Sequence, residues 1–137
     1  GSMVSFYRGI PDKNNYRRFR IKTVQGIDDY KMLGEVVHRR YLRLLKEKLP
    51  LPDLILIDGG KAHLLTANAK LNNLGINIPL VSIAKETENI YTKYNSKPIK
   101  LSWDTPALNL IRRIRDEAHR FAVSYHRILR RKKIIGR

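Results

Sequence analysis

The central hydrophobic run of the chain is Leu54 to Ile57, within the stretch Pro-Asp-Leu-Ile-Leu-Ile-Asp-Gly-Gly-Lys at 52–61. Because the run contains no polar residue, both of its faces must be covered, which predicts a central strand of a parallel or mixed sheet. Asp58 follows at the carboxyl end, where open α/β sheets bind their ligands. Gly59 and Gly60 allow a sharp turn and a close approach to the backbone. This context favours a functional carboxylate over a solvated strand end.

Two strands are predicted before this run. The first covers residues 3–8, and the second covers residues 16–24, where apolar Phe19 and Ile21 alternate with basic residues. A period of two gives the second strand one apolar and one basic face. Residues 9–15 have the composition of a loop, so the two strands are predicted to form a hairpin. The basic face is either a nucleic-acid contact or, by default, a solvated edge that resists aggregation.

Helical spacing of apolar residues predicts two helices around the central strand. The first is capped by Asp28 through Asp29 and extends to Leu49, before Pro50. The second runs from Gly60 to about Asn73, with Gly75 as its stop. Four leucines of the second helix are predicted to face inward: Leu64, Leu65, Leu71 and Leu74. A further buried strand is predicted over residues 79–84.

The C-terminal part begins with a predicted hairpin over residues 85–101 that turns at Asn95-Ser96. Thr105 then caps a long last helix that starts at Pro106 and leads into a basic tail. The complete order is strand, strand, helix, strand, helix, strand, hairpin, helix. This order predicts a mixed α/β layer fold.

A polar stripe runs along the last helix beside its apolar stripe. Arg112, Arg115, His119 and His126 follow one another at spacings of three, four and seven, so they share a face. For an isolated histidine, a satisfied surface position is the commoner arrangement. His119 is predicted to border the core, and the alternative to a satisfied surface position is that it meets Asp58 over the end of the central sheet. A carboxylate and an imidazole can together hold a divalent ion, or position a water and move its proton.

Composition adds a charge argument. The 137 residues are 42% apolar, which suits one globular domain, and 28 Lys and Arg against 12 acids give a net charge of +16. Such an excess favours a polyanionic partner, first of all nucleic acid. An anionic membrane is the rival partner, but no apolar run is long enough to span a bilayer and no signal peptide is visible. The absence of cysteine excludes disulfides and thiolate metal sites and suits a cytoplasmic protein.

Common phosphate-binding and catalytic motifs are missing. The sequence Gly59-Gly60-Lys61 lacks the first glycine, the spacing and the following Ser or Thr of a P-loop. There is no zinc-type pair of histidines at helical spacing with a Glu, and no nucleophile elbow. The residues therefore predict a basic α/β domain with a metal-dependent site.

Three motifs in a fixed order carry a family resemblance. They are Gly-Ile-Asp-Asp-Tyr at 26–30 before Arg-Arg-Tyr at 39–41, the stretch 52–61, and Pro-Ala-Leu at 106–108 leading into Ile-Arg-Asp-Glu-Ala-His-Arg-Phe-Ala at 114–122. Together they strongly resemble the C-terminal endonuclease domain of UvrC, the incision subunit of bacterial nucleotide excision repair. The similarity covers residues 4–131. Residues 1–3 are expected to be a tag remnant before the domain, and residues 132–137 a basic tail.

The resemblance implies a ribonuclease H-like mixed sheet flanked by helices. It also implies an endonuclease, dependent on Mg²⁺ or Mn²⁺, that cuts DNA on the 5′ side of a lesion after UvrA and UvrB have marked it. The family's acidic residue maps onto Asp58 and its histidine onto His119, as catalytic residues and metal ligands. A further Asp maps onto Asp29, or less well onto Asp28, and the same pair equally suits a helix start. The residues expected to contact DNA are Lys61, Arg112, Arg115, Arg127, Arg130 and Arg131, although Lys61 equally suits the start of a helix.

One departure from the family changes the expected activity. The family's domain begins with a strand carrying Asp in a Phe/Tyr-Asp-x-Ser-His pattern, which nothing in this chain matches. Residues 3–6 resemble the strand that comes after it, so the resemblance implies that the first strand is missing. Since metal-dependent phosphoryl transfer uses several carboxylates, weak metal binding and little or no nicking are expected of this chain alone. The alternative function is a non-catalytic basic DNA-binding module.

Overall fold

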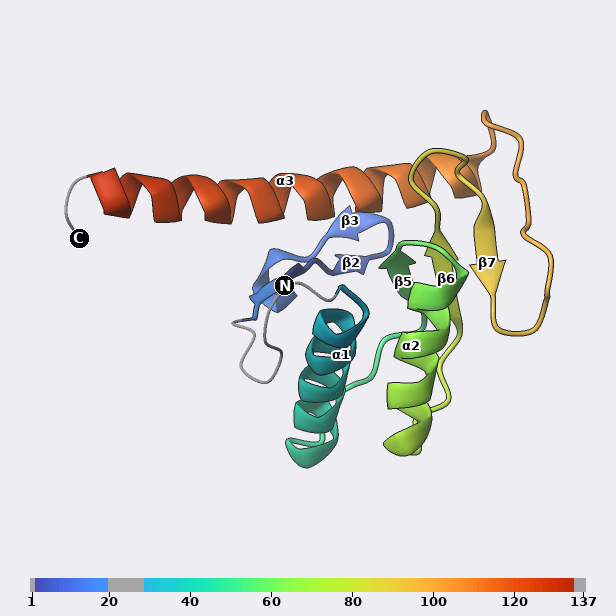
Figure 1. Cartoon of the computed structure of the whole chain (residues 1–137), viewed down its shortest axis with the longest axis horizontal. Coiled ribbons are helices and arrows are strands. Elements are labelled where there is room, and N and C mark those ends of the chain that lie inside the picture. The colour runs from blue at the N-terminus through green and yellow to red at the C-terminus, as the bar shows by residue number, and fades with distance from the viewer. Residues whose placement is uncertain (1, 20–28, 135–137) are drawn as a thin grey trace. The chain divides into compact units, whose positions relative to one another are not determined.

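The structure is a computed structural model that describes residues 2–19 and 29–134, without the side chains at 125, 126, 129 and 132–134 (Figure 1). The chain divides into two compact units. The first, called the long-helix unit below, comprises residues 1–20 and 102–137. The second, called the sheet unit, comprises residues 21–101 and contains Asp58.

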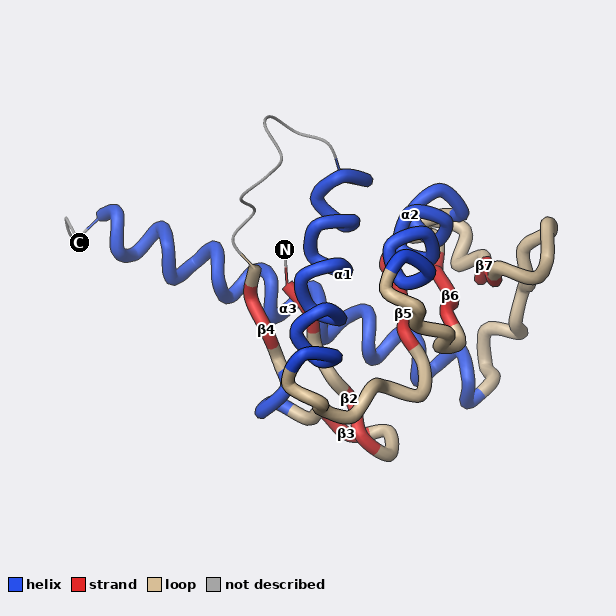
Figure 2. Tube along the Cα trace, turned by 90° about the horizontal axis from the view of Figure 1, so that it is seen from below, coloured by secondary structure: helices blue, strands red, loops and turns tan. Residues whose placement is uncertain are grey.

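The sheet unit is an α/β arrangement, as predicted. Its three-stranded sheet has the order β5-β6-β7, with β5 and β6 parallel and β6 and β7 antiparallel. Helices α1 and α2 lie side by side (Figure 2) and cover one face of this sheet. The bounds of the elements are Asp29–Lys46 for α1, Ile55–Asp58 for β5, Lys61–Asn73 for α2, Leu80–Ile83 for β6 and Ile90–Thr92 for β7.

The core between the helices and the sheet explains which hydrophobic positions are buried. Ile55 and Ile57 of β5 pack against Leu64 and Leu71 of α2 in one cluster. Leu65 was predicted to face inward, but it is 50% exposed. Neighbouring helical positions differ by about 100° in direction, so Leu64 and Leu65 cannot both face the sheet.

Both faces of the 54–57 run were predicted to be covered, and this is wrong for Leu54, which is 50% exposed. Leu54 precedes the strand, whose first link to β6 is the hydrogen bond from Ile55 N to Pro79 O, at 3.0 Å. Leu54 and Leu56 also point away from the face that carries Ile55 and Ile57. The core is therefore built on one face of β5.

The two helices of the sheet unit end in the same way. At the end of α2, Ile76 N donates to Leu71 O and Gly75 N to Asn72 O, both at 2.9 Å, with Gly75 at φ +70°. This is a Schellman motif with glycine at its left-handed position, and it confirms the predicted stop. Helix α1 ends the same way with Lys48 at φ +55°, so it stops at Lys46 and not at Leu49. The predicted cap at Asp28 lies outside the described residues.

The hairpin predicted over residues 85–101 is present, but its second strand is much shorter than predicted. Strand β7 pairs with β6, and the returning segment makes one bridge, in which Ile90 and Ile99 exchange backbone hydrogen bonds of 2.9 and 2.7 Å. The predicted second strand, 97–101, is therefore limited to this bridge. Pro98 offers no N–H to a ladder, which is consistent with the short pairing.

The long-helix unit combines α3 (Pro106–Ile134) with four short strands. The bounds of these strands are Ser2–Met3 for β1, Phe6–Tyr7 for β2, Ile10–Pro11 for β3 and Arg17–Arg18 for β4. Pairing of β1 with β4 confirms a hairpin between the two predicted strands as far as they are described. Strand β4 ends at Arg18, and residues 20–24 of the second predicted strand lie outside the described residues.

The first predicted strand is broken, and the predicted loop contains β3, which pairs with β2. Arg8 and Gly9 between them have φ values of +53° and +78°. Positive φ at both central residues is typical of a type I′ hairpin turn. The usual sequence of such a turn is Asn-Gly, so Arg-Gly did not predict it. A 3₁₀ helix at Lys13–Asn15 separates β3 from β4.

Helix α3 starts where the sequence predicts. Leu108 N donates to Thr105 Oγ1 at 3.4 Å, so Thr105 is the cap and Pro106 the first helical residue. Tyr16 joins the N-terminal segment to this helix by donating its hydroxyl to Glu117 Oε2 at 2.7 Å, and its ring meets Phe121 edge-on at 5.0 Å. The hydrogen bond between Tyr16 and Glu117, which are 101 positions apart, thus helps to hold the long-helix unit together.

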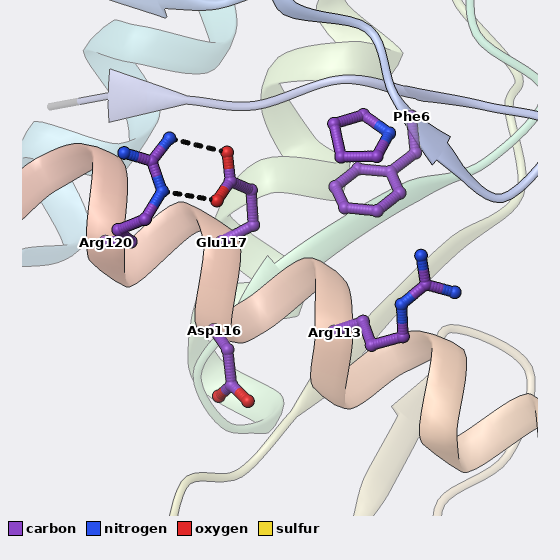
Figure 3. A pocket seen from close by; sticks show the side chains of 6 residues that line it. Phe6, Arg113, Asp116, Glu117 and Arg120 are labelled. Carbon is purple, nitrogen blue, oxygen red and sulfur yellow. Dashed lines mark hydrogen bonds and ion pairs between the residues drawn. The ribbon is translucent and has the colours of Figure 1, made fainter.

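Glu117 is the electrostatic centre of this contact. Arg120 donates two hydrogen bonds to its carboxylate, at 2.6 and 2.8 Å (Figure 3). These bonds, above all, lower the pKa of Glu117 to about 2, while burial and the bond to Glu117 raise the pKa of Tyr16 to about 12. Around neutral pH, Glu117 therefore stays ionised and accepts hydrogen bonds, while Tyr16 stays protonated and donates one.

Candidate functional site

Asp58 is the last residue of β5, and its side chain is exposed. It lies opposite Ile83, the last residue of β6, in the parallel ladder. Gly59 N extends the pairing by donating to Ile83 O at 3.0 Å. The carboxylate therefore stands at the carboxyl edge of two parallel strands, where α/β sheets bind ligands.

The turn after Asp58 is held by side chains from two elements. Ser82 of β6, fully buried, donates its hydroxyl to Gly60 O at 3.2 Å. Gly60 N donates to Nδ1 of His63 at 3.3 Å. His63 is the third residue of α2, a position from which a side chain reaches back to the N-terminus of its own helix. These contacts limit the movement of the turn and so of Asp58.

His63 was missed as a candidate by sequence reasoning. Its imidazole ring stacks at a tilt on Tyr30, with 4.6 Å between the ring centroids. Tyr30 follows Asp29 at the start of α1, so the helix start that carries Asp29 lies beside the turn that follows Asp58. The only sequence signal was the third-position spacing of His63 after Gly60.

Replacing Gly59 by Ala tests how tightly this turn is packed. The added Cβ would lie 2.6 Å from Cγ and Nδ1 of His63 and 2.9 Å from its Cβ. Overpacking of this kind costs about 1–3 kcal/mol, so Gly59→Ala is expected to lower the free energy of unfolding by that amount in urea denaturation. The double variant Gly59→Ala/His63→Ala should relieve only part of the loss, because the φ of +158° at Gly59 disfavours any side chain and an alanine at position 63 would keep its Cβ 2.9 Å away.

Gly60→Ala is the matched control, because a Cβ at Gly60 meets nothing within 4 Å. It should change the free energy of unfolding by less than about 0.5 kcal/mol. An equal loss for Gly60→Ala, or no coupling between Gly59 and His63, would contradict the packing of the turn.

Lys61 makes contacts within the sheet unit. Its Nζ donates to Thr92 O at 2.6 Å and to Asn95 O at 2.9 Å, so the start of α2 is tied to the loop after β7. These bonds occupy two of the three protons of the ammonium group. The predicted contact of Lys61 with DNA stays a prediction.

The polar residues of α3 lie in the long-helix unit. Arg112 donates to Trp103 O at 2.7 Å, and Arg115 forms a 3.8 Å ion pair with Asp116. His119 is exposed, so the expectation that it borders the core is wrong. It is two positions from both Glu117 and Phe121, which places it about 200° around the helix from the face that packs against the N-terminal segment.

The basic end of α3 has three exposed arginines, Arg127, Arg130 and Arg131. The side chain of His126 is outside the described part of the chain. Asp58 belongs to the sheet unit and His119 to the long-helix unit, so their meeting at one site stays a prediction.

The fit of a metal ion depends on the available donors. Asp58 provides an exposed carboxylate, and Mg²⁺ in proteins is commonly held by one or two carboxylates together with water and substrate phosphates. Among residues 2–19 and 29–134, no group of three or more His, Asp or Glu side chains gathers at one place. Asp58 thus fits Mg²⁺ or Mn²⁺ as one ligand of a site that substrate oxygens help to complete.

The fold and its candidate site define a strongly basic α/β domain with a carboxylate on a restrained turn at the end of a mixed sheet. The chain belongs to the UvrC RNAse H endonuclease domain family, whose model matches residues 1–123. This confirms the family resemblance of the three motifs and agrees with the ribonuclease H-like fold that the resemblance implies.

Similar proteins support the same assignment. The chain is 56% identical over 135 residues to UvrABC system protein C of Methanococcus maripaludis, covering 98% of this chain and 26% of that protein. It is 52% identical over 135 residues to the protein of the same name from Methanosarcina barkeri, with the same coverage. The corresponding protein of Chlorobium phaeobacteroides is 51% identical over 134 residues, covering 98% of this chain and 21% of that protein. The chain spans about a quarter of the length of these curated relatives.

None of the helices in the described part of the chain is both long and apolar enough to cross a membrane.

Proposed function

We propose that this chain is a part of the endonuclease domain of a UvrC-type protein, and that the complete protein hydrolyses the phosphodiester on the 5′ side of a DNA lesion with Mg²⁺ or Mn²⁺ as cofactor. The observation that carries the proposal is the exposed Asp58 carboxylate on its restrained turn, in a chain of the UvrC RNAse H endonuclease domain family. The remaining residues are assigned around it.

Asp58 holds the metal ion, and Asp29, at the neighbouring helix start, supplies a second carboxylate. A bound divalent ion lowers the pKa of an attacking water and stabilises the negative charge of the transition state. His119 either joins the ligands or transfers a proton during hydrolysis. Both roles of His119 require the two units to bring it to Asp58.

The DNA backbone is held by basic side chains. Arg112 and Arg115 act near the reacting phosphate, and Arg127, Arg130 and Arg131 extend the contact along α3. With a net charge of +16, the affinity for DNA should fall steeply with salt, because each neutralised phosphate releases counterions.

The partners of the proposed activity are DNA and, through the full-length protein, UvrA and UvrB in the cytoplasm. The similar proteins carry the name UvrABC system protein C, which supports this assembly. The 137-residue chain alone is expected to nick DNA weakly or not at all, since nothing in it matches the family's first catalytic Asp.

A nicking assay tests the proposal. The full-length protein that contains this domain, with UvrA and UvrB, should cut a lesion-bearing duplex on the 5′ side in Mg²⁺ or Mn²⁺ and should stop cutting in EDTA. Salt-dependent DNA binding should persist in EDTA. If DNA is bound but never cut, with either metal, the chain is a non-catalytic DNA-binding module.

A further inference from the structure

The loop over residues 93–100, called the Tyr94 loop below, has an unusual composition. Its sequence is Lys-Tyr-Asn-Ser-Lys-Pro-Ile-Lys, with three lysines, one tyrosine and no acidic residue. The side chain of Tyr94 is 79% exposed, and Lys97 and Lys100 are exposed as well. An aromatic ring in water among cations is the combination by which proteins bind single-stranded nucleic acid.

The Tyr94 loop is held at its base. Ile90 and Ile99 exchange two backbone hydrogen bonds across it, and Lys61 donates to Thr92 O and Asn95 O on either side of Tyr94. Lys93 Nζ donates to Oδ1 of Asn77 at 3.1 Å and lies 5.4 Å from the centroid of the Tyr94 ring. A ring presented by a supported loop loses less conformational entropy on binding than a ring on a free chain.

Lys61 also relates the Tyr94 loop to the candidate site. Lys61 is the first residue of α2 and follows the Asp58-Gly59-Gly60 turn directly. Its side chain also binds the backbone on both sides of Tyr94. All of these residues belong to the sheet unit. Because β7 runs antiparallel to β6, with Ile90 opposite Ile83 and Thr92 opposite Val81, the loop leaves the sheet on the side away from Asp58, and the side chain of Lys61 spans the two.

We propose that the Tyr94 loop binds an unpaired segment of DNA, with the Tyr94 ring stacked on a base and Lys97 and Lys100 on neighbouring phosphates. The inference deepens the proposed function and rests on DNA being its substrate. A single strand is the favoured form because a ring needs the exposed face of a base, which stacking hides inside a duplex. The loop would then hold locally opened DNA on the same unit that carries Asp58.

The test is a binding titration of the 137-residue chain in EDTA, so no cutting is needed. Fluorescence anisotropy with a labelled oligothymidine and with a duplex of equal length gives both affinities. Since base stacking on an aromatic side chain contributes strongly, Tyr94→Ala should weaken single-strand binding by roughly 5- to 100-fold. Duplex binding should change less than about twofold, and Tyr94→Phe should keep the single-strand affinity, because stacking needs the ring alone.

Tyr7→Ala is the matched control. Tyr7 is 64% exposed and has its own cation, Arg8, with the guanidinium carbon 5.2 Å from the ring centroid. It belongs to the other unit and not to the Tyr94 loop, so single-strand affinity should be unchanged. Equal losses for Tyr7→Ala and Tyr94→Ala, or equal losses on single strand and duplex, would overturn the proposal.

The lysines give an independent readout. For single strands, each phosphate contact contributes about 0.7 to the slope of log affinity against log salt, so Lys97→Ala/Lys100→Ala should lower that slope by about 1.4. An unchanged slope would overturn the phosphate contacts. The binding results also separate the two proposals: loss of stacking with Tyr94→Ala supports the loop even where no nicking occurs, whereas nicking with normal Tyr94→Ala binding supports only the nuclease.

Discussion

Replacing Asp58 by Asn is expected to reduce nicking by the full-length protein about a thousandfold or more. Asn keeps the size of the side chain and removes the charge that attracts a divalent ion. Metal-assisted charge stabilisation is worth several kcal/mol in the transition state, and about 1.4 kcal/mol corresponds to tenfold in rate. Single-turnover nicking of a lesion-bearing duplex measures the loss, and Mn²⁺ affinity, followed by electron paramagnetic resonance, should fall in parallel.

The exposure of Asp58 makes this result interpretable. An exposed side chain at the end of a strand contributes little to packing, so the free energy of unfolding should change by less than about 0.5 kcal/mol. Asp53→Asn is the matched control, since Asp53 is an exposed aspartate that precedes β5 instead of ending it. Normal nicking by Asp58→Asn, or an equal loss with Asp53→Asn, would remove Asp58 from the site.

Replacing His119 by Ala is expected to slow nicking by about a hundredfold to ten thousandfold, the range that a positioned proton-transfer group contributes. The stability should be almost unchanged, because His119 is exposed on α3. DNA binding should also persist, since the basic residues remain. Single-turnover nicking with saturating metal, together with a binding titration, separates the loss of chemistry from the loss of affinity.

The metal and pH dependence of the variant distinguishes the two roles of His119. A ligand role predicts that Ala raises the Mg²⁺ concentration needed for half-maximal rate, whereas a proton-transfer role predicts a lost limb in the pH–rate profile at unchanged metal demand. His38→Ala removes another imidazole, from α1, and should leave both profiles unchanged. A full nicking rate in His119→Ala would show that the histidine does not reach the reacting phosphate.

Local features of the fold could be predicted from the sequence because few neighbouring residues encode them. The apolar run before Asp58 predicts β5, Gly75 predicts the end of α2, and Thr105 with Pro106 predicts the start of α3. Each depends on hydrophobic period or on end chemistry within about four residues. The errors occurred where local pattern leaves two choices, as at Leu65, whose neighbour Leu64 occupies the core.

Composition and motif order also determined, without coordinates, the positive charge, the candidate carboxylate Asp58 and the family to which the chain belongs. Only the tertiary structure showed that His63 supports the turn after Asp58, that Lys61 holds the Tyr94 loop 31 and 34 positions away, and that Tyr16 bonds Glu117 across 101 positions. The physical reason is that a single side chain offers many potential partners. Which partner it meets depends on how distant elements pack, and no spacing along the chain encodes that choice.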